Sequence, residues 1–297
     1  MSELGAPEVL VPAELPDPLP GPGQVLIEVE VANIVFVETQ VRAGHAPNPA
    51  MVPALPAIPG NGVGGTVDGR RVISGTGGTG GYAERVAVDA EGVIDVPDGL
   101  ELADAVALLA DGRTATRLIG AARIQPGETV LVEAAAGGVG SLLVQLAAAA
   151  GARVVAAAGG ARKVAVARGL GADVAADYTE PGWSDGLEPV DVVFDGVGGE
   201  IARAAFDLLR PGGRFCPYGM ASGAFAQVPE RQGVTVVRGE RPSPAEMLAA
   251  TRSALAEAAA GRLRPVIGQT FPLERAAEAH AAIEARETIG KTLLLVR

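Results

Sequence analysis

The chain has 297 residues and a formal net charge of −11, and 48% of its residues are hydrophobic although only 3% are aromatic. This length suffices for two modest domains, and the acidic balance argues against nucleic acids and anionic membranes as partners. The single cysteine, Cys216, excludes an intramolecular disulfide and a Cys-rich structural zinc site within one chain. Because the N-terminus lacks a signal-like pattern and no apolar run is long enough for a membrane helix, we expect a soluble cytoplasmic protein.

The first hundred or so residues are rich in Gly and Pro and contain short strand-like segments. Residues 24–32 alternate apolar and polar side chains, which predicts a half-buried strand. Residues 69–74 and 80–88 have a similar pattern and are also predicted strands. The intervening stretch "PALPAIPGNGVGG" (53–65) has the composition of a breaker segment. This region is therefore expected to be an irregular, mostly β domain.

From about Leu102 the pattern changes to alternating helices and strands. Such alternation predicts a parallel sheet with helices on both faces. Ser243 and Glu246 have capping-box spacing around Pro244, which predicts a helix running to about Ala260. The predicted helices cover 101–122, 140–150, 162–170, 200–210 and 271–285, and the predicted strands cover 128–134, 153–158, 190–196, 212–219 and 290–296.

A glycine-rich turn, "AAAGGVG", separates the strand at 128–134 from the following helix. Dinucleotide-binding folds place Gly-x-Gly-x-x-Gly at this point, because the glycines allow a tight turn and close approach of the backbone to a pyrophosphate. Here the three positions of that motif are Ala135, Gly137 and Gly140. The motif alone is weak, but its strand–turn–helix context favours a nucleotide site over a merely flexible turn.

The second strand of this region predicts which nicotinamide cofactor binds. In NAD-binding versions an acid at its end accepts hydrogen bonds from the ribose 2′-hydroxyl. Here Ala158 and Gly159 stand at about that place, and Arg162 and Lys163 follow. Residues 151–172 carry four cations and no acid. Because cations attract a 2′-phosphate and a carboxylate repels it, the pattern favours NADPH, although both cations could simply solvate a helix surface.

Several further stretches accompany these features: "LGADVAADY", "DVVFDGVGG", "PGGRFCPYGMASG", "GKTLLLV" and, nearer the N-terminus, "PAIPGNGVGGTV". Together they make the chain resemble the zinc-free quinone oxidoreductase (zeta-crystallin-like) branch of the medium-chain dehydrogenase/reductase superfamily. The resemblance implies an α/β protein, with a GroES-like, mostly β catalytic domain from residues 1–110 and 265–297. It also implies a Rossmann NADPH-binding domain, a doubly wound parallel sheet, from residues 111–264. A homodimer is usual in such proteins.

The resemblance also assigns candidate site residues. In that family a lysine and a tyrosine bind the 2′-phosphate, and they correspond to Lys163 and Tyr178. The full set of expected cofactor-binding residues is Thr114, Gly137, Gly138, Val139, Gly140, Gly159, Arg162, Lys163, Tyr178, Val197, Gly198, Gly219 and Met220. The expected substrate pocket contains Val35, His45, Ala46 and Asn61.

The chain departs from the superfamily at the places where zinc ligands and polar substrate contacts are found. The zinc-ligand places hold Val35, Asn61 and a residue near Gly112, so we expect no metal. Val35 and Ala46 also replace the Asn and Tyr usual in quinone reductases. His45, beside Ala46, is then either an acid or substrate contact or an exposed loop histidine, and no other catalytic residue is assigned.

Four other residues have simple structural interpretations. His280 is expected to pack on a helix, Tyr82 to pack between the two domains, and Cys216 to act as a small buried hydrophobe. Glu38 could line the nicotinamide ribose or make a local hydrogen bond, as could Thr39.

Three functions fit these observations. The first is an NADPH-dependent, zinc-independent reductase that transfers a hydride to a quinone or an activated alkene. The second is an enoyl reductase or tailoring enzyme acting on a bulkier biosynthetic substrate. The third is a non-catalytic NADPH-binding sensor. In each case the expected partner is a small molecule, and the sequence does not name it.

Overall fold

The computed structural model describes residues 1–238 and 242–296, and the chain divides into two compact units. The first unit contains Met1–Gly112 and Thr251–Arg297, and the second contains Arg113–Ala250. The boundaries fall within two helices, α2 (Leu102–Ala122) and α6 (Pro244–Ala259), each of which belongs partly to both units. The predicted boundaries are 110/111 and 264/265, and the second lies after α6 because the sequence pattern changes only after Pro265.

The first unit is built on a seven-stranded sheet with the order β12-β13-β1-β2-β3-β5, and β4 also pairs with β1. The long strand β1 lies between β13 from the C-terminal segment and β2 from the N-terminal segment, so both ends of the chain contribute to one sheet. The strands of this sheet are β1 (Gln24–Ile34), β2 (Gly62–Val67), β3 (Arg70–Gly75), β4 (Arg85–Asp89), β5 (Ile94–Asp95), β12 (Ile267–Pro272) and β13 (Lys291–Leu295). The α-helices that belong wholly to the first unit are α1 (Phe36–Arg42) and α7 (Ala276–Glu284). The unit also has 3₁₀ turns at Pro7–Val9, Pro49–Met51, Ala90–Gly92 and Leu273–Arg275.

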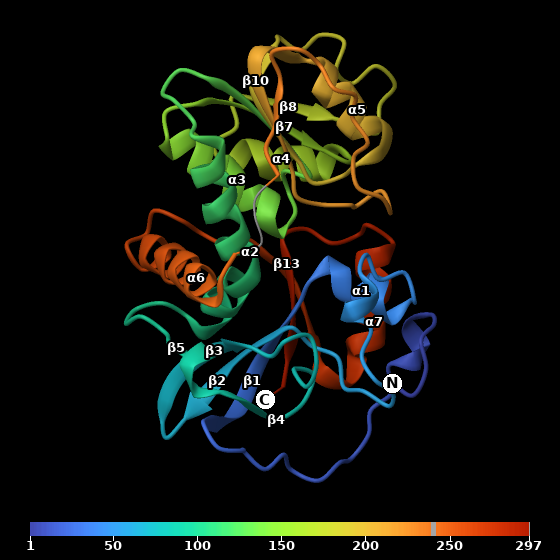
Figure 1. Cartoon of the computed structure of the whole chain (residues 1–297), viewed down its shortest axis with the longest axis vertical. Helices are drawn as coiled ribbons and strands as arrows, with labels where there is room; N and C mark the ends of the chain where they lie inside the picture. Colours follow the sequence, from blue (N-terminus) through green and yellow to red (C-terminus); the bar gives the residue numbers. More distant parts are fainter. Residues whose placement is uncertain (239–241, 297) are drawn as a thin grey trace. The chain divides into compact units, whose positions relative to one another are not determined.

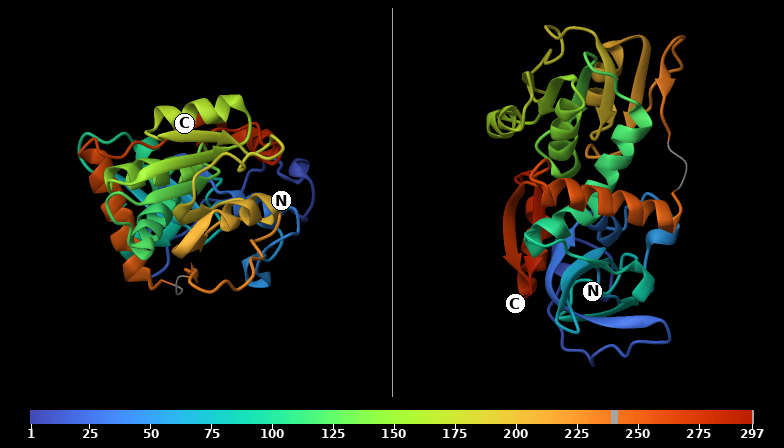
Figure 2. Two further views of the ribbon diagram at one scale, coloured as in Figure 1. Left: turned by 90° about the horizontal axis from the view of Figure 1, so that it is seen from above. Right: turned by 90° about the vertical axis from the view of Figure 1, so that its left-hand side faces the viewer.

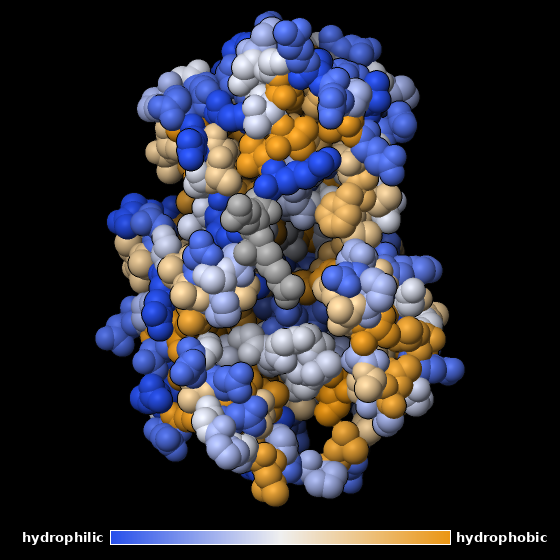
Figure 3. All heavy atoms as spheres, viewed as in Figure 1, coloured by the Kyte–Doolittle hydropathy of each residue, from blue (hydrophilic) through white to orange (hydrophobic). Residues whose placement is uncertain are grey.

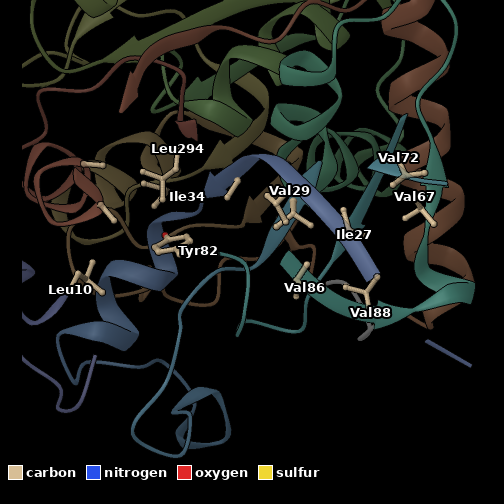
Figure 4. Close-up of a cluster of buried hydrophobic side chains, with 14 of the residues drawn as sticks. Leu10, Ile27, Val29, Ile34, Val67, Val72, Tyr82, Val86, Val88 and Leu294 are labelled. Carbon is tan, nitrogen blue, oxygen red and sulfur yellow. The ribbon is translucent and has the colours of Figure 1, made fainter. Parts of the chain in front are cut away.

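The core of the first unit consists mostly of aliphatic side chains from the sheet and from α7. Figure 4 shows Ile27 and Val29 of β1 near Val86 and Val88 of β4, with Tyr82 on the other side of the cluster. Ile27 and Val29 are completely buried, and alternate residues of β4 point into the core. The alternating pattern of residues 24–32 therefore predicted the buried face of this strand correctly.

The second unit is a six-stranded parallel sheet with the order β11-β10-β9-β6-β7-β8, flanked by helices (Figures 1 and 2). The strand order runs outward in both directions from β6 and β9, which is the doubly wound arrangement. Its elements are β6 (Thr129–Glu133), α3 (Gly138–Ala149), β7 (Arg153–Ala158), α4 (Ala161–Gly169), β8 (Val174–Asp177), β9 (Val190–Asp195), α5 (Gly199–Asp207), β10 (Leu209–Pro217) and β11 (Thr235–Val236).

Two predicted elements were wrong in extent. The strand predicted from residue 80 begins only at Arg85, because Gly80 has a positive φ of 84° and Gly81 packs directly against the backbone of Gly60. The helix predicted over 271–285 begins only at Ala276, because Phe271 and Pro272 end a strand and a 3₁₀ turn follows. In the second case the helical pattern of apolar residues continued past the boundary, so it did not reveal the change of backbone.

The glycine-rich stretch predicted to be a breaker contains β2, which pairs with both β1 and β3. A Cβ at Gly65 would clash with the carbonyl oxygen of Glu28, and one at Gly64 would clash with Val106. These glycines are therefore needed for close packing inside a sheet. The sequence analysis treated them as turn residues because glycine is common in both settings.

On the face shown in Figure 3, apolar and polar side chains are interspersed. The exposed large apolar side chains include Val11, Leu15, Leu19 and Phe225. Among the described residues, no helix combines the length and the apolar character required to cross a bilayer.

Candidate functional site: a dinucleotide cradle

The glycine-rich turn joins β6 to α3. Gly137 is the N-cap of α3, and its N–H donates to the carbonyl of Ala134 at 2.7 Å. A Cβ on Gly140 would clash with that same carbonyl oxygen, so glycine lets the first helical turn lie directly against the strand end. Gly138 and Val139 form this turn, whose N–H groups have no partners within the helix. The structure thus provides a helix N-terminus that can bind a pyrophosphate.

The predicted 2′-phosphate residues come together at the ends of β7 and β8. Tyr178 donates its N–H to the carbonyl of Ala158 at 3.1 Å. A Cβ on Gly159 would lie only 2.9 Å from the Tyr178 ring, so the missing side chain lets the ring pack against the backbone. Arg162 and Lys163 lie in the first turn of α4, the first exposed and the second half-buried.

A carboxylate also reaches this corner, which the sequence analysis missed. The Oδ1 atom of Asp177 accepts hydrogen bonds from the N–H of Gly160 at 2.9 Å, the N–H of Thr179 at 3.0 Å and the Thr179 hydroxyl at 2.6 Å. The hydroxyl of Thr179, together with these N–H groups, holds the pKa of Asp177 below its usual range. The stretch 151–172 is free of acids, but β8 brings Asp177 beside it in space.

The loops that follow β9 and β10 lie together. Asp195 Oδ1 accepts hydrogen bonds from the N–H groups of Val197 at 2.9 Å and Gly198 at 2.7 Å. Gly219 donates its N–H to the carbonyl of Asp195 at 3.2 Å, and Met220 is the next residue in the same loop. The structure thus brings these four predicted residues into two contacting loops. Thr114 belongs to α2 and is half-buried.

Two of the predicted pocket residues, Val35 and Asn61, are joined by the carboxylate of Glu38. Val35 donates its N–H to Glu38 Oε2 at 2.6 Å, and the N–H of Asn61 bonds to the same carboxylate. Burial raises the pKa of Glu38 to about 7, against the lowering effect of these N–H groups and of Lys291. The Thr39 hydroxyl donates to a backbone carbonyl within α1. The hydrogen bonds of both side chains fit their local structural interpretation.

His45 lies apart from this arrangement. It is exposed, and its N–H donates to the carbonyl of Gln40 at 2.8 Å. It lines a groove of the first unit together with Phe36, Gln40, Glu284 and Arg286. Val35, the half-buried Ala46 and Asn61 do not line that groove. The structure therefore favours the interpretation of His45 as an exposed loop residue.

His280 and Cys216 are buried as predicted, whereas Tyr82 belongs to the core cluster of the first unit and its packing between the domains stays a prediction. His280 Nε2 lies 2.9 Å from the Tyr82 hydroxyl, and burial lowers the pKa of His280 to about 3. Both side chains are packed in the interior of the first unit. Cys216 is completely buried in β10, and burial raises the pKa of its thiol to about 12, so it is an unreactive small hydrophobe.

The places that hold zinc ligands in related dehydrogenases do not suit zinc here. Val35 has no donor side chain, and Asn61 is not among the ordinary zinc ligands. Near Gly112, the third place, the carboxylate of Asp111 is paired with Lys291 at 3.1 Å. Within residues 1–238 and 242–296, no group of three or more His, Cys, Asp or Glu side chains is placed to hold a metal ion. The residues present therefore do not fit a catalytic zinc.

Known proteins resemble the chain over nearly its whole length. A 2-haloacrylate reductase from Burkholderia sp is 32% identical over 98% of this chain and 96% of that protein. A quinone oxidoreductase from Pseudomonas aeruginosa is 30% identical over 98% of this chain and 97% of that protein. The profile of a family described as zinc-binding dehydrogenase matches residues 170–294.

Solved structures also resemble the chain over nearly its whole length. An Escherichia coli quinone oxidoreductase complexed with NADPH superposes with a TM-score of 0.88 at 28% identity, covering 99% of this chain and 98% of that chain. A mycobacterial protein complexed with NADPH superposes with a TM-score of 0.86 at 31% identity, covering 99% of this chain and 98% of that chain. An NAD-dependent alcohol dehydrogenase superposes with a TM-score of 0.87 at 28% identity, covering 100% of this chain and 98% of that chain.

Proposed function

The chain belongs to the quinone oxidoreductase branch of the medium-chain dehydrogenase/reductase superfamily and is an oxidoreductase, and on this premise we propose that it uses NADPH to reduce a quinone or an activated alkene without zinc. The observation that carries the proposal is the cradle formed by the glycine turn, the α4 cations and the loops after β9 and β10. Because the relatives are named as enzymes, a purely sensory role has no support. A small-molecule substrate, a homodimer and a cytoplasmic location are further parts of the proposal.

Each part of the cradle suits one part of a dinucleotide. The turn Gly137–Gly140 would hold the pyrophosphate at the α3 N-terminus. Lys163 and Tyr178 would hold the 2′-phosphate, and the loops containing Val197 and Gly219 would flank the nicotinamide half. When bound, the reduced nicotinamide supplies a hydride. The structures of relatives complexed with NADPH support this choice of cofactor, although one relative is described as NAD-dependent.

The composition of the expected pocket supports an acceptor that needs little help from protein acids. Val35 and Ala46 carry no polar side-chain group, and His45 lines a different groove. A quinone forms a stabilised hydroquinone anion whose oxygens can be protonated by water. A simple enone instead yields an enolate that needs a proton at carbon, and a positioned acid typically accelerates such a step about 10²–10⁴-fold. We therefore infer that quinones and strongly activated alkenes are reduced faster than simple enones.

A bulkier biosynthetic substrate is the second candidate, because small apolar side chains such as Ala46 would leave room for it. Oxidation of NADPH should be followed against a panel of quinones, halogenated alkenes and simple enones, and then against long-chain enoyl thioesters. Faster turnover of quinones and activated alkenes supports the first candidate. A clear preference for simple enones or for enoyl thioesters would reject it.

Cofactor choice is tested with Lys163→Ala. Removing this cation should cost roughly 1–3 kcal/mol of NADPH affinity, the range for a hydrogen bond to a charged group, and leave NADH affinity nearly unchanged. Affinities are measured by titrating the fluorescence of each reduced cofactor. Arg168→Ala, at the exposed C-terminal end of α4, is the matched control. Equal losses for both cofactors would show that Lys163 does not read the 2′-phosphate.

Zinc independence is tested by metal analysis of the purified protein and by assay after treatment with a chelator. We expect no stoichiometric zinc and no loss of activity. Activity lost to the chelator and restored by zinc would contradict this part of the proposal.

A further inference from the structure

Two carboxyl groups lie side by side in the interior of the second unit. Glu133 ends β6 and Asp195 ends β9, and these strands are parallel neighbours in which Val132 pairs with Phe194. Glu133 and Asp195 are therefore the next residues along, at the same edge of the sheet. Both are completely buried, and the Asp195 carboxyl acts on that of Glu133.

The oxygens of this pair have few other partners. Asp195 Oδ1 is occupied by the N–H groups of Val197 and Gly198. Asp195 Oδ2 and both Glu133 oxygens are buried and have no hydrogen-bond donor in bonding geometry among the described residues. Two acceptors in contact cannot bond unless one of them holds a proton. The contact thus requires a proton between Glu133 and Asp195.

Among the described residues, no cation is among the groups that act on the Glu133 carboxyl. The strand neighbour of Glu133 is Ala157 and that of Asp195 is Pro217, and both are uncharged. The phenol of Tyr218 donates to the backbone carbonyl of Glu133 at 3.1 Å. Burial and then the Asp195 charge raise the pKa of Glu133 well above its usual range, so Glu133 is the protonated partner.

The pair connects two parts of the cradle. The glycine turn begins at Ala134, the residue directly after Glu133, while Asp195 fixes the Val197–Gly198 turn through two N–H groups. We propose that Glu133 and Asp195 form a proton-sharing pair that positions both turns for the dinucleotide, so that cofactor affinity depends on the shared proton. This inference rests on the dinucleotide binding in the proposed function.

The charge of the pair determines whether cofactor affinity rises or falls with pH. At neutral pH it holds one proton and one negative charge, and the turns are joined. At alkaline pH the proton is lost, the two charges repel one another in a buried place, and the turns separate. Cofactor affinity should therefore fall as pH rises, by up to about tenfold per pH unit, the limit for linkage to one proton.

Three variants separate this role from a merely structural one. Glu133→Gln keeps a donor to Asp195 that cannot be deprotonated, so NADPH affinity should match the wild type near pH 7 and persist at alkaline pH. Glu133→Met removes the donor, so it should weaken NADPH affinity at neutral pH and abolish the pH dependence that comes from the pair. Glu188→Gln changes an exposed carboxylate on the loop before β9 and should follow the wild-type profile.

The measurement is the dissociation constant of NADPH by fluorescence titration from pH 6 to 10. Infrared spectroscopy of the free protein provides a second readout, because the protonated carboxyl of the pair should add a band that Glu133→Gln loses, while the contribution of Glu38 is the same in both proteins. Parallel pH profiles for the wild type and Glu133→Gln, or no such band, would overturn the pair. Failure of the wild type to bind any dinucleotide would instead reject the cofactor part of the proposed function, and the infrared band would still decide whether the proton is shared.

Discussion

At the scale of single residues, Asp177 changes how the cofactor corner should be understood. Its carboxylate is kept ionised by hydrogen bonds from Thr179 and Gly160, and it adjoins Tyr178, which is expected to contact the 2′-phosphate. A negative charge at this place would oppose the attraction exerted by Lys163. We infer that the preference for NADPH is weaker than the cations alone suggest.

We predict that Asp177→Asn raises NADPH affinity relative to NADH. Asn keeps an oxygen that can accept the bond from Gly160, but removes the charge. Two unit charges 4 Å apart in water interact by about 1 kcal/mol, so the affinity ratio should rise by about fivefold. The ratio is measured by fluorescence titration at low salt, where screening is weakest.

Asp207→Asn, on the exposed face of α5, is the control for net charge and should leave the ratio unchanged. An unchanged ratio in Asp177→Asn would mean that its carboxylate does not act on the 2′-phosphate.

At the scale of elements, the glycines of the turn test whether close approach of strand and helix is essential. A Cβ on Gly140 would meet the carbonyl of Ala134, whereas one on Gly120, in the exposed part of α2, would meet nothing within 4 Å. Gly140→Ala should lower Tm by roughly 2–12 °C, as expected for overpacking of 1–3 kcal/mol in a protein of this size, and should also weaken NADPH binding.

Gly120→Ala makes the same chemical change where there is room for it. Because alanine favours a helix over glycine by about 1 kcal/mol, this control should raise Tm by roughly 2–4 °C and leave NADPH binding unchanged. Similar Tm changes in the two variants would show that the turn tolerates a side chain.

The elements of the second unit could be predicted from the sequence more completely than those of the first. Parallel strands buried on both faces give continuous apolar runs, such as residues 130–132 and 154–158, and helices alternate with them. In the first unit, β2 was missed because its glycines resemble a loop, and α1 because its residues show no long periodic pattern. The short strands β8, β11 and β12 were missed because pairing with neighbouring strands supports them.

The same contrast holds for the candidate site. Residues carried by a local motif, such as Gly137 and Lys163, could be found because the motif lies within one stretch of chain. Asp177, Asp195 and Glu133 could not be recognised in this way, because their importance depends on which strands become neighbours. The groove containing His45 was likewise hidden, since it includes residues from both ends of the chain.

At the scale of the whole molecule, buried titratable groups set how stability depends on pH. The folded-state pKa of His280 is about 3, below its ordinary 6.5, so its contribution is fully present above pH 6.5 and is lost as pH falls toward 3. Glu38 acts in the opposite direction. Its folded-state pKa is about 7, above the ordinary 4.5, so its contribution is present below pH 4.5 and is lost as pH rises through 7.

We predict that Glu38→Gln becomes progressively more stable than the wild type between pH 4.5 and 7. The unfolded wild type ionises Glu38 in this range while the folded state resists, so the difference in unfolding free energy should change by on the order of 3 kcal/mol. His280 and Glu133 are present in both proteins, so their contributions cancel in the difference. The difference in unfolding free energy is measured by denaturant unfolding at half-unit pH steps. Glu91→Gln, at an exposed position, is the control, and its unfolding free energy should change with pH in parallel with that of the wild type. If Glu38→Gln also stayed parallel, Glu38 would be ionised in the folded protein at pH 5, and the Glu38 carboxylate would be less strongly desolvated than its buried position requires.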